Sequence, residues 1–396
     1  MTQRLGLLGL VAALLAVALW APDASAYPWM IRHGYTGCST CHSDPSGGTL
    51  LSAYGRAQSE LLLSTQWSRQ PSEEPSSASQ QLLGLPLPKQ LLVGADVRDG
   101  YIWNFATVGL VDHRFLHMRS DVMAQLKISR LRLYGSIGYA TPASAVNSQQ
   151  AYVTRSASWG NIVSREHWVG VDVGRHVLLR GGRLIQPFGV RIIDHPMWVR
   201  SETHTDLNQQ QQHGVSVAYD GSHVRAEGMA ILGNYQISPD TYRERGFAGY
   251  AEIYPKGTWS LGASAKATHA GTDLVLRTPT TRQAYGLMGR VKAIDPLVFT
   301  GEVDVLAQSA QGRGGTEIGH ASMLSADLQV ASGLHLVGTG ESRSLGDNGM
   351  VALGGWLSAW WFPIPHADVR LDFVSRTTPG GGSSAQTILL QGHIYL

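Results

Sequence analysis

The sequence predicts an all-β fold, an antiparallel barrel of about sixteen strands that follows a small N-terminal α-helical segment. The first observation is alternation: from residue 90 to residue 396, stretches of roughly ten residues place apolar and polar side chains on opposite faces. The second is that short and long connections alternate between these stretches. The third is composition, with 46 glycines and only 15% charged residues. Together they favour a barrel that spans a membrane and turns its apolar face to lipid.

Residues 1–26 have the pattern of a secretory signal peptide. Arg4 precedes an apolar run over residues 5–20, and Ala24-Ser25-Ala26 supplies the small residues of a cleavage site. The run is shorter than the roughly 18 apolar residues that a membrane-spanning helix needs. We therefore expect an exported protein whose mature chain starts at Tyr27.

The next segment, residues 27–67, contains Cys38-Ser39-Thr40-Cys41-His42. This is the C-x-x-C-H pattern by which a c-type haem is attached. Cys38 and Cys41 would each bind a haem vinyl group, and His42 would bind the iron as the proximal ligand. The chain has 2 cysteines, so the motif uses both. The motif predicts one covalent haem c as the cofactor.

The motif has three other interpretations. A structural zinc site usually has four protein ligands, and this motif supplies only three. A redox-active dithiol of the thioredoxin type would lie near a βαβ pattern, which the sequence lacks. A disulfide between residues this close would shorten almost no loop and add little stability. Export also favours haem, because c-type haem is attached outside the cytoplasm.

The rest of the segment predicts a turn and a helix that pack on the haem. Pro45-Ser46-Gly47-Gly48 indicates the turn, and Thr49 is a candidate N-cap. About forty residues cannot bury a sizeable core alone, so the segment needs cover from elsewhere. Residues 68–89, rich in proline, serine and glutamine, predict an extended linker.

The sixth ligand of the iron has two candidates beside the motif, His33 and Met30. Imidazole binds iron in either redox state, and Gly34 lets the chain turn back, so we expect His33 over Met30. Met30 is otherwise explained as hydrophobic cover, and His33 as a solvated polar residue. A side chain from the barrel lumen is the third possibility, which the sequence does not position.

Residues 90–396 predict the barrel itself. Val303 and Val305 alternate with Glu302 and Asp304, and the same period of two recurs along the chain. Tight turns are expected at Arg130, Gly174, Asp220-Gly221, Pro255-Lys256-Gly257, Asp295-Pro296, Ser332-Gly333 and Pro365-His366. Longer connections are expected over residues 102–114, 141–164, 186–212, 233–245, 270–281, 309–318, 345–349 and 378–384.

The alternation of tight turns and longer connections is typical of bacterial outer-membrane barrels, which have short periplasmic turns and longer extracellular loops. An even number of strands places the N-terminal haem segment on the periplasmic side or in the lumen.

The lumen carboxylates, among them Glu227, Glu302, Asp304 and Asp372, are expected to be solvated pore lining. The net charge of +2 argues against nucleic acid as a partner. Hydrolase motifs and phosphate-binding glycine loops are absent from the sequence.

The chain resembles the fused outer-membrane monohaem cytochrome c–porin family, whose best-known members are iron oxidases of iron-oxidising bacteria. The likeness is carried by the signal peptide, the single C-x-x-C-H motif, the barrel, and Tyr54-Gly55-Arg56, where the family has Phe-Gly-Arg. A further stretch, residues 183–200 with Pro187-Phe188-Gly189 and Asp194-His195, is similar to one in porin-like barrels, although strand plus loop explains it as well.

Two classes of function follow. The resemblance implies electron transfer through the haem between an extracellular redox donor or acceptor, with ferrous iron as one candidate, and periplasmic cytochromes or other carriers. Acting on such a metal ion would make the protein an oxidoreductase. The alternative is a porin for small solutes, in which the haem-bearing segment is a plug or sensor. The sequence fixes neither the substrate nor the direction of electron flow.

Overall fold

The structure, a computed structural model, describes residues 28–35, 37–47, 50–65, 81–82, 85–106, 109–140, 161–194, 196–255, 257–346 and 348–396. The predicted signal peptide, residues 1–26, lies outside these ranges, as does most of the predicted linker, 68–89. The described end of the linker forms a small hairpin of β1 (Gln81–Leu82) and β2 (Leu85–Pro86). Among the described residues, no helix has the length and hydropathy needed to cross a membrane.

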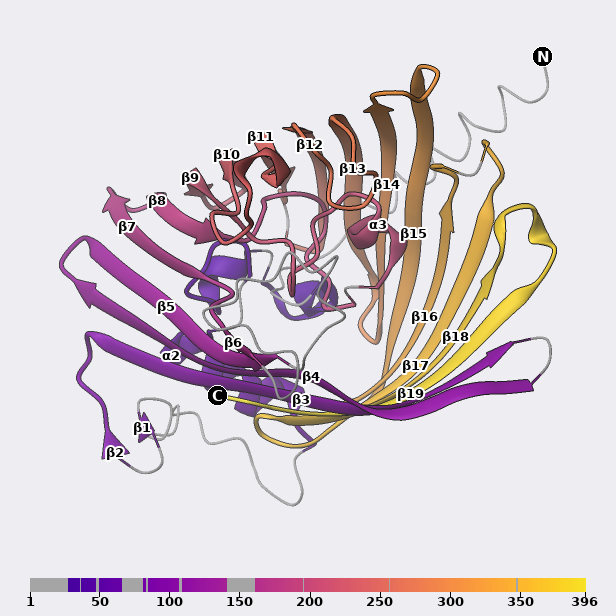
Figure 1. Cartoon of the computed structure of the whole chain (residues 1–396). Coiled ribbons are helices and arrows are strands. Elements are labelled where there is room, and N and C mark those ends of the chain that lie inside the picture. The colour runs from indigo at the N-terminus through magenta and orange to yellow at the C-terminus, as the bar shows by residue number, and fades with distance from the viewer. Residues whose placement is uncertain are drawn as a thin grey trace, which may run out of the picture.

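The body of the molecule is a closed antiparallel barrel, in which the last strand pairs with the first (Figure 1). Two short strands, β6 and β7, both pair with β5, so they form one interrupted strand. The described barrel thus has sixteen strands around its circumference, which confirms the predicted fold class. The strands are β3 (Leu91–Ala106), β4 (Gly109–Ile128), β5 (Leu131–Ala140), β6 (Asn161–Val163), β7 (His167–Val173), β8 (Val177–Leu184), β9 (Gln212–Asp220), β10 (Val224–Gly233), β11 (Arg245–Ile253), β12 (Trp259–Ala270), β13 (Thr280–Ile294), β14 (Leu297–Ala310), β15 (Thr316–Ala331), β16 (Leu334–Arg343), β17 (Ala352–Ile364), β18 (Ala367–Thr377) and β19 (Ser384–Tyr395).

The two faces of the barrel have the predicted polarity. On β14, Val303 and Val305 are 55% and 53% exposed on the outer face, whereas Glu302 and Asp304 are buried on the inner face. An apolar outer face is favourable only against lipid, so this is the architecture of an outer-membrane barrel. The prediction that the inner carboxylates are solvated pore lining is wrong. Glu227, Glu302, Asp304 and Asp372 are all buried, because other parts of the chain fill the lumen.

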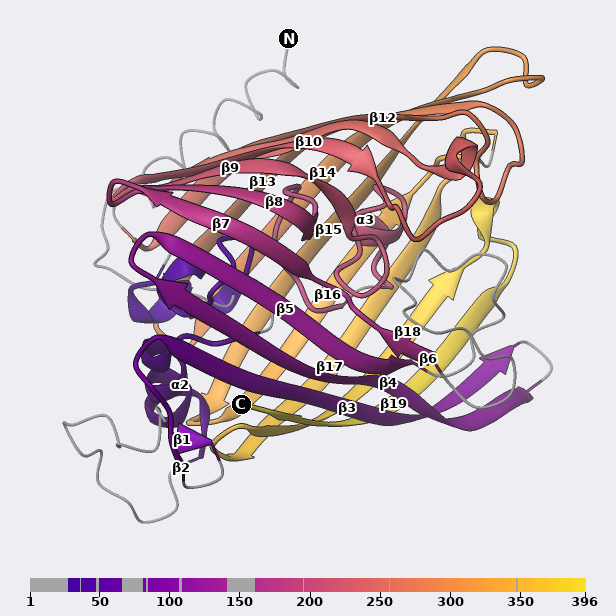
Figure 2. The ribbon, with the colours of Figure 1, turned by 60° about the vertical axis from the view of Figure 1, so that its left-hand side comes forward.

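The connections mostly lie where the sequence predicts them. Six of the seven tight turns are present in the described residues, and they gather at one end of the barrel (Figure 2). In the seventh, at Pro255-Lys256-Gly257, Lys256 lies outside the described residues. The connection predicted over residues 102–114 is wrong, because β3 and β4 continue as a hairpin in which Ile102 pairs with Arg114 and Ala106 with Gly109. Tyr101, Trp103 and Phe105 have high strand propensity, and they extend the ladder past the polar residues that suggested a loop. The connection predicted over residues 141–164 lies mostly outside the described residues.

The N-terminal segment lies in the barrel opening at the end with the tight turns (Figures 1 and 2). We call its described residues from 28 to 65 the plug. It consists of the 3₁₀-helical turns η1 (Pro28–His33) and η2 (Cys38–Thr40), the helix α2 (Ala53–Gln58) and the π-helical turn η3 (Ser59–Leu63). The predicted cap Thr49 lies outside the described residues. Ser52 caps α2, and its Oγ accepts a hydrogen bond from the Gly55 amide at 3.0 Å.

Hydrogen bonds and buried ion pairs tie the plug to strands that are distant in sequence. Arg32 pairs with Asp327 of β15, and Asp44 pairs with Arg180 of β8. The Thr65 amide donates to the Phe362 carbonyl at 2.8 Å, next to a tight turn. The plug is thus held on several sides of the barrel wall.

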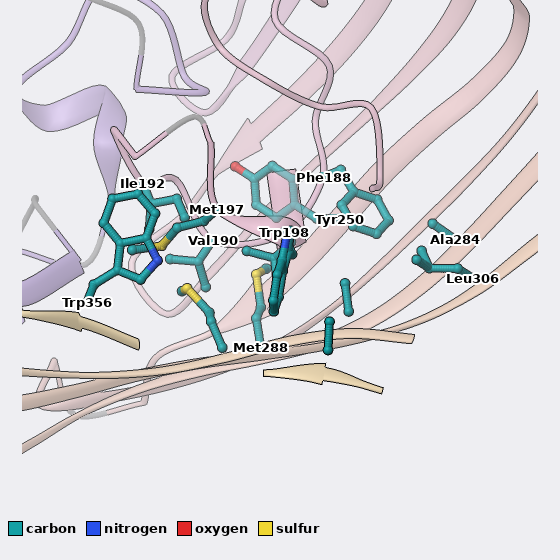
Figure 3. Packing of buried hydrophobic residues seen from close by; sticks show 14 of the residues in the cluster. Phe188, Val190, Ile192, Met197, Trp198, Tyr250, Ala284, Met288, Leu306 and Trp356 are labelled. Atoms are coloured by element: carbon teal, nitrogen blue, oxygen red, sulfur yellow. The ribbon is translucent and has the colours of Figure 1, made fainter. Parts of the chain in front are cut away.

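The connection between β8 and β9, residues 185–211, folds into the lumen and carries the short helix α3 (Trp198–Ser201). We call it the inward loop; its His195 lies outside the described residues. Phe188, Val190, Ile192, Met197 and Trp198 of this loop pack against strand residues that include Tyr250, Met288 and Trp356 (Figure 3). The inside of the barrel therefore contains a hydrophobic core and buried ion pairs.

Candidate functional site

A cavity of about 370 Å³ lies between the plug, the inward loop and the barrel wall, and all three residues of the motif line it. Cys38 and Cys41 are buried and are not joined to each other. The structure thus brings Cys38, Cys41 and His42 to one cavity, as haem attachment requires.

The local sequence explains this orientation. The Cys41 and His42 amides both donate to the Cys38 carbonyl, at 3.2 Å and 2.9 Å, which curls the motif into one helical turn. The following chain braces it, since the Ser52 amide donates to the Cys41 carbonyl at 2.8 Å. A side chain at Gly55 would overlap that same carbonyl. Gly55 therefore allows α2 to pack directly against the motif.

The thiols lie in contrasting surroundings. Burial, together with the neighbouring Cys38, raises the pKa of Cys41 to about 12, so its thiol is protonated at neutral pH. Arg225 of β10 donates through Nη1 to the Cys38 sulfur at 3.0 Å. The same guanidinium donates through Nε to Glu252 at 2.6 Å.

The cavity lining combines apolar side chains with arginines. Apolar cover comes from the plug, the inward loop and the strands, including Met30, Leu51, Leu63, Ile102, Ile185, Val190 and Ile192. The lining arginines are Arg98, Arg119, Arg191, Arg225, Arg290 and Arg376, and the lining carboxylates are Asp96, Glu166, Asp194 and Glu252. A haem has an apolar macrocycle, an iron that needs an axial ligand, and two carboxylate groups. Two thiols, an imidazole, apolar walls and an excess of arginine fit this set of requirements.

The zinc interpretation stays an alternative to haem. In the described part of the chain, no three histidine, cysteine or carboxylate side chains gather as ligands for a bare metal ion. The motif would therefore have to find its remaining ligands elsewhere.

The two sixth-ligand candidates occupy different places. Met30 is 3% exposed and lines the cavity beside the motif. His33 instead lines a separate hollow with Arg32, Asp295 and Gln329. Burial, and the positive charge of Arg32, lower the pKa of His33 to about 4, so its imidazole is neutral.

Some residues that line the cavity could not be recognised as such from the sequence. Met118 of β4, Met288 of β13 and His393 of β19 reach the cavity from strands that are far from the motif in the chain. Only barrel closure brings them there, so the spacing of residues could not have indicated them.

No protein-family model and no curated protein matches the chain. Solved structures do match in fold. A loop-deletion mutant of OmpT, an outer membrane protein of Vibrio cholerae, is 14% identical, with a TM-score of 0.60 over 77% of this chain and 99% of that chain. An anion-selective porin from Comamonas acidovorans is 12% identical, with a TM-score of 0.56 over 77% and 99%. The outer membrane channel DcaP of Acinetobacter baumannii is 12% identical, with a TM-score of 0.54 over 77% and 97%.

This likeness concerns the fold, and it agrees with the predicted location in the bacterial outer membrane. The resemblance to cytochrome–porin fusions stays a prediction.

Proposed function

We propose that this protein transfers electrons across the outer membrane through one covalent haem c held between the plug and the barrel. It would link an extracellular redox partner to periplasmic cytochromes or other carriers. The observation that carries the proposal is that Cys38, Cys41 and His42 face a single cavity that is walled by apolar side chains. Cys38 and Cys41 would hold the haem covalently, and His42 would bind its iron.

When bound, the haem supplies one-electron chemistry. The protein's own residues supply its position. The plug places the motif at the end with the tight turns, which faces the periplasm in barrels of this kind. The inward loop lines the cavity through Val190, Arg191 and Ile192. The resemblance adds ferrous iron as a candidate extracellular donor, in which case the protein would be an oxidoreductase.

The experiment asks whether the folded barrel contains covalently bound haem. Wild-type protein should give a haem-stained band in the outer-membrane fraction, with heat-modifiable gel mobility and a reversible redox titration. Changing Cys38 or Cys41 to Ala should abolish normal covalent attachment and leave heat-modifiable mobility, because the barrel strands begin about fifty residues later. His42→Ala should retain more attachment than redox behaviour, because the imidazole binds iron and not the vinyl groups.

Cys38→Ala with full haem incorporation and an unchanged spectrum would contradict the proposal. A wild-type barrel without haem would do so as well.

A second candidate function is a porin for small solutes, with the plug as its regulator. The similarity of the barrel to porins, one of them anion-selective, favours it. Planar-bilayer recordings separate the two: a porin would conduct ions steadily as purified, whereas a plugged electron-transfer protein would show little conductance and a redox-active haem.

A further inference from the structure

One cavity-lining arginine differs from the other arginines around it. Arg225 and Arg290 both pair with Glu252 at 2.5 Å, Arg119 pairs with Asp121 at 2.6 Å, and Arg376 pairs with Glu341 at 2.7 Å. Arg98 donates to a ring nitrogen of His393 at 3.2 Å. All three guanidinium nitrogens of Arg191 are buried, and none has a hydrogen-bond partner among the described residues.

The position of Arg191 is fixed by its backbone and its stem. The adjacent Val190 amide donates to Glu302 at 2.7 Å, and Arg200 of the same loop pairs with that carboxylate. The Arg191 guanidinium carbon lies 5.9 Å from the centre of the Tyr250 ring. These contacts hold the side chain in place. Glu227 acts on its charge, but no carboxylate among the described residues hydrogen-bonds to the guanidinium.

Arg191 also lies next to the haem-attachment motif. A Cβ built on Gly47 would lie 3.2 Å from the Cys38 sulfur and 3.9 Å from Cγ of Arg191. The cysteine and the arginine therefore flank the same glycine. A buried cation without an anion is unfavourable, so an anionic group is expected in this part of the cavity.

We infer that Arg191 binds a propionate carboxylate of the cavity's haem, an inference that rests on the proposed function. A guanidinium presents paired N–H donors that match a carboxylate. The haem carries two such carboxylates, and the other arginines, apart from Arg98, already have carboxylate partners. Arg191 is thereby the residue of the inward loop that positions the haem against the barrel.

The test compares Arg191→Gln, Arg191→Lys and the control Arg290→Gln in full-length, haem-bearing protein. Arg290 lines the same cavity but is already paired, so its loss changes the local charge without freeing a propionate. Three quantities are measured: haem per folded protein, the reduction potential as a function of pH, and the propionate bending band in the resonance Raman spectrum.

Arg191→Gln should shift the propionate band and lower the reduction potential, because removal of a nearby positive charge favours the ferric state. Its potential should also fall as pH rises through the neutral range, since an unpaired propionate titrates there and a paired one does not. Arg191→Lys should restore part of both effects. Arg290→Gln should leave the band unmoved.

An unchanged propionate band and an unchanged pH profile in Arg191→Gln, with haem attached, overturn the inference and leave the proposed function standing. A wild-type protein without covalent haem overturns both. Heat-modifiable mobility of each variant shows that its barrel has folded. If Arg191→Gln does not fold, Arg191→Lys decides: it must shift the propionate band, because it lacks the paired donors, and an unmoved band overturns the inference.

Discussion

At the scale of single residues, two glycines determine how the C-x-x-C-H motif is presented. Gly55 allows α2 to contact the Cys41 carbonyl, and Gly47, at a φ of +83°, leaves room beside the Cys38 sulfur. Gly47 adopts a backbone conformation that is unfavourable for other residues. The space around the thiols thus depends on residues outside the motif.

The first residue-scale prediction concerns the sixth ligand. Met30→Ala should remove a methionine-to-iron band from the near-infrared spectrum of the ferric protein and lower its potential, because methionine raises the potential of a histidine-ligated haem. Met30 lines the cavity whereas His33 does not, so His33→Ala should leave both quantities unchanged.

Met118→Leu is the matched control, since Met118 lines the same cavity and leucine has a similar volume. Retention of the band in Met30→Ala, or its loss in Met118→Leu, would show that Met30 is not the ligand.

The sequence predicts the motif residues because their chemistry depends on local spacing. Cys38, Cys41 and His42 need only to be near each other in the chain, and they are. Arg191 and Arg225 could not be predicted, because their roles arise from barrel closure and from the inward folding of a loop. The preference for His33 over Met30 rests on chain flexibility at Gly34, whereas the cavity lining favours Met30. The identity of the sixth ligand stays a prediction.

At the scale of elements, the inward loop depends on one buried carboxylate. Glu302 of β14 pairs with Arg200 and accepts a hydrogen bond from the Val190 amide. Between them, Gly189 has a φ of +62°, and a side chain there would overlap both Glu302 and Arg200. A strand carboxylate and a loop glycine together hold the loop in the lumen.

We therefore predict that Gly189→Ala loosens the inward loop. The backbone conformation alone costs about 1–2 kcal/mol for a residue with a side chain, and the overlap with the Arg200–Glu302 pair adds to it. The expected result is faster proteolysis within residues 185–211 and a lower unfolding temperature.

Gly181→Ala on β8 is the control, because a Cβ at Gly181 would meet no atom within 4 Å. Equal protease resistance of the two variants would contradict this account of Gly189.

The sequence predicts the strands and turns of the barrel wall better than it predicts the segments inside the barrel. The period of two and the turn residues predict strands and tight turns, since both are local properties. The inward course of residues 185–211 depends on Glu302, more than 90 residues later in the chain. The sequence predicts a long connection over residues 186–212, and Pro187-Phe188-Gly189 resembles a porin stretch, but neither indicates that the loop folds inward.

At the scale of the whole molecule, the plug and the barrel form one buried polar network. Asp44 and Ser46 of the plug meet Arg180 and Glu227 of the wall, and the Ser46 hydroxyl donates to Glu227 at 2.8 Å. Arg180 pairs with Glu227 at 2.5 Å. The sequence left open whether the segment rests at the mouth or inside the lumen. These contacts, between residues 136 and 181 positions apart, join it to buried side chains of β8 and β10.

The prediction at this scale is that plug contacts limit ion flow. The double variant Arg32→Gln, Asp44→Asn removes a plug partner from each of two buried pairs, and breaking such a pair typically costs about 3–5 kcal/mol. Single-channel conductance in planar bilayers should rise above that of wild type, or openings should become more frequent.

Asp240→Asn serves as the control, because Asp240 is in an exposed loop pair with Arg243 and Arg245, and exposed ion pairs add little stability. Conductance in the double variant equal to that of the control would mean that other contacts hold the plug.

The enclosure of Cys38 and Cys41 also fixes an order of events during biogenesis. Both sulfurs face a space bounded by the plug, the inward loop and strands from across the barrel. An enzyme that attaches haem to cysteines is far larger than this space. It could not reach the two thiols once β19 has paired with β3. Under the proposed function, haem ligation would therefore precede barrel closure, on a periplasmic precursor whose strands are still open. The barrel would then close in the outer membrane around an N-terminal segment that already carries its haem.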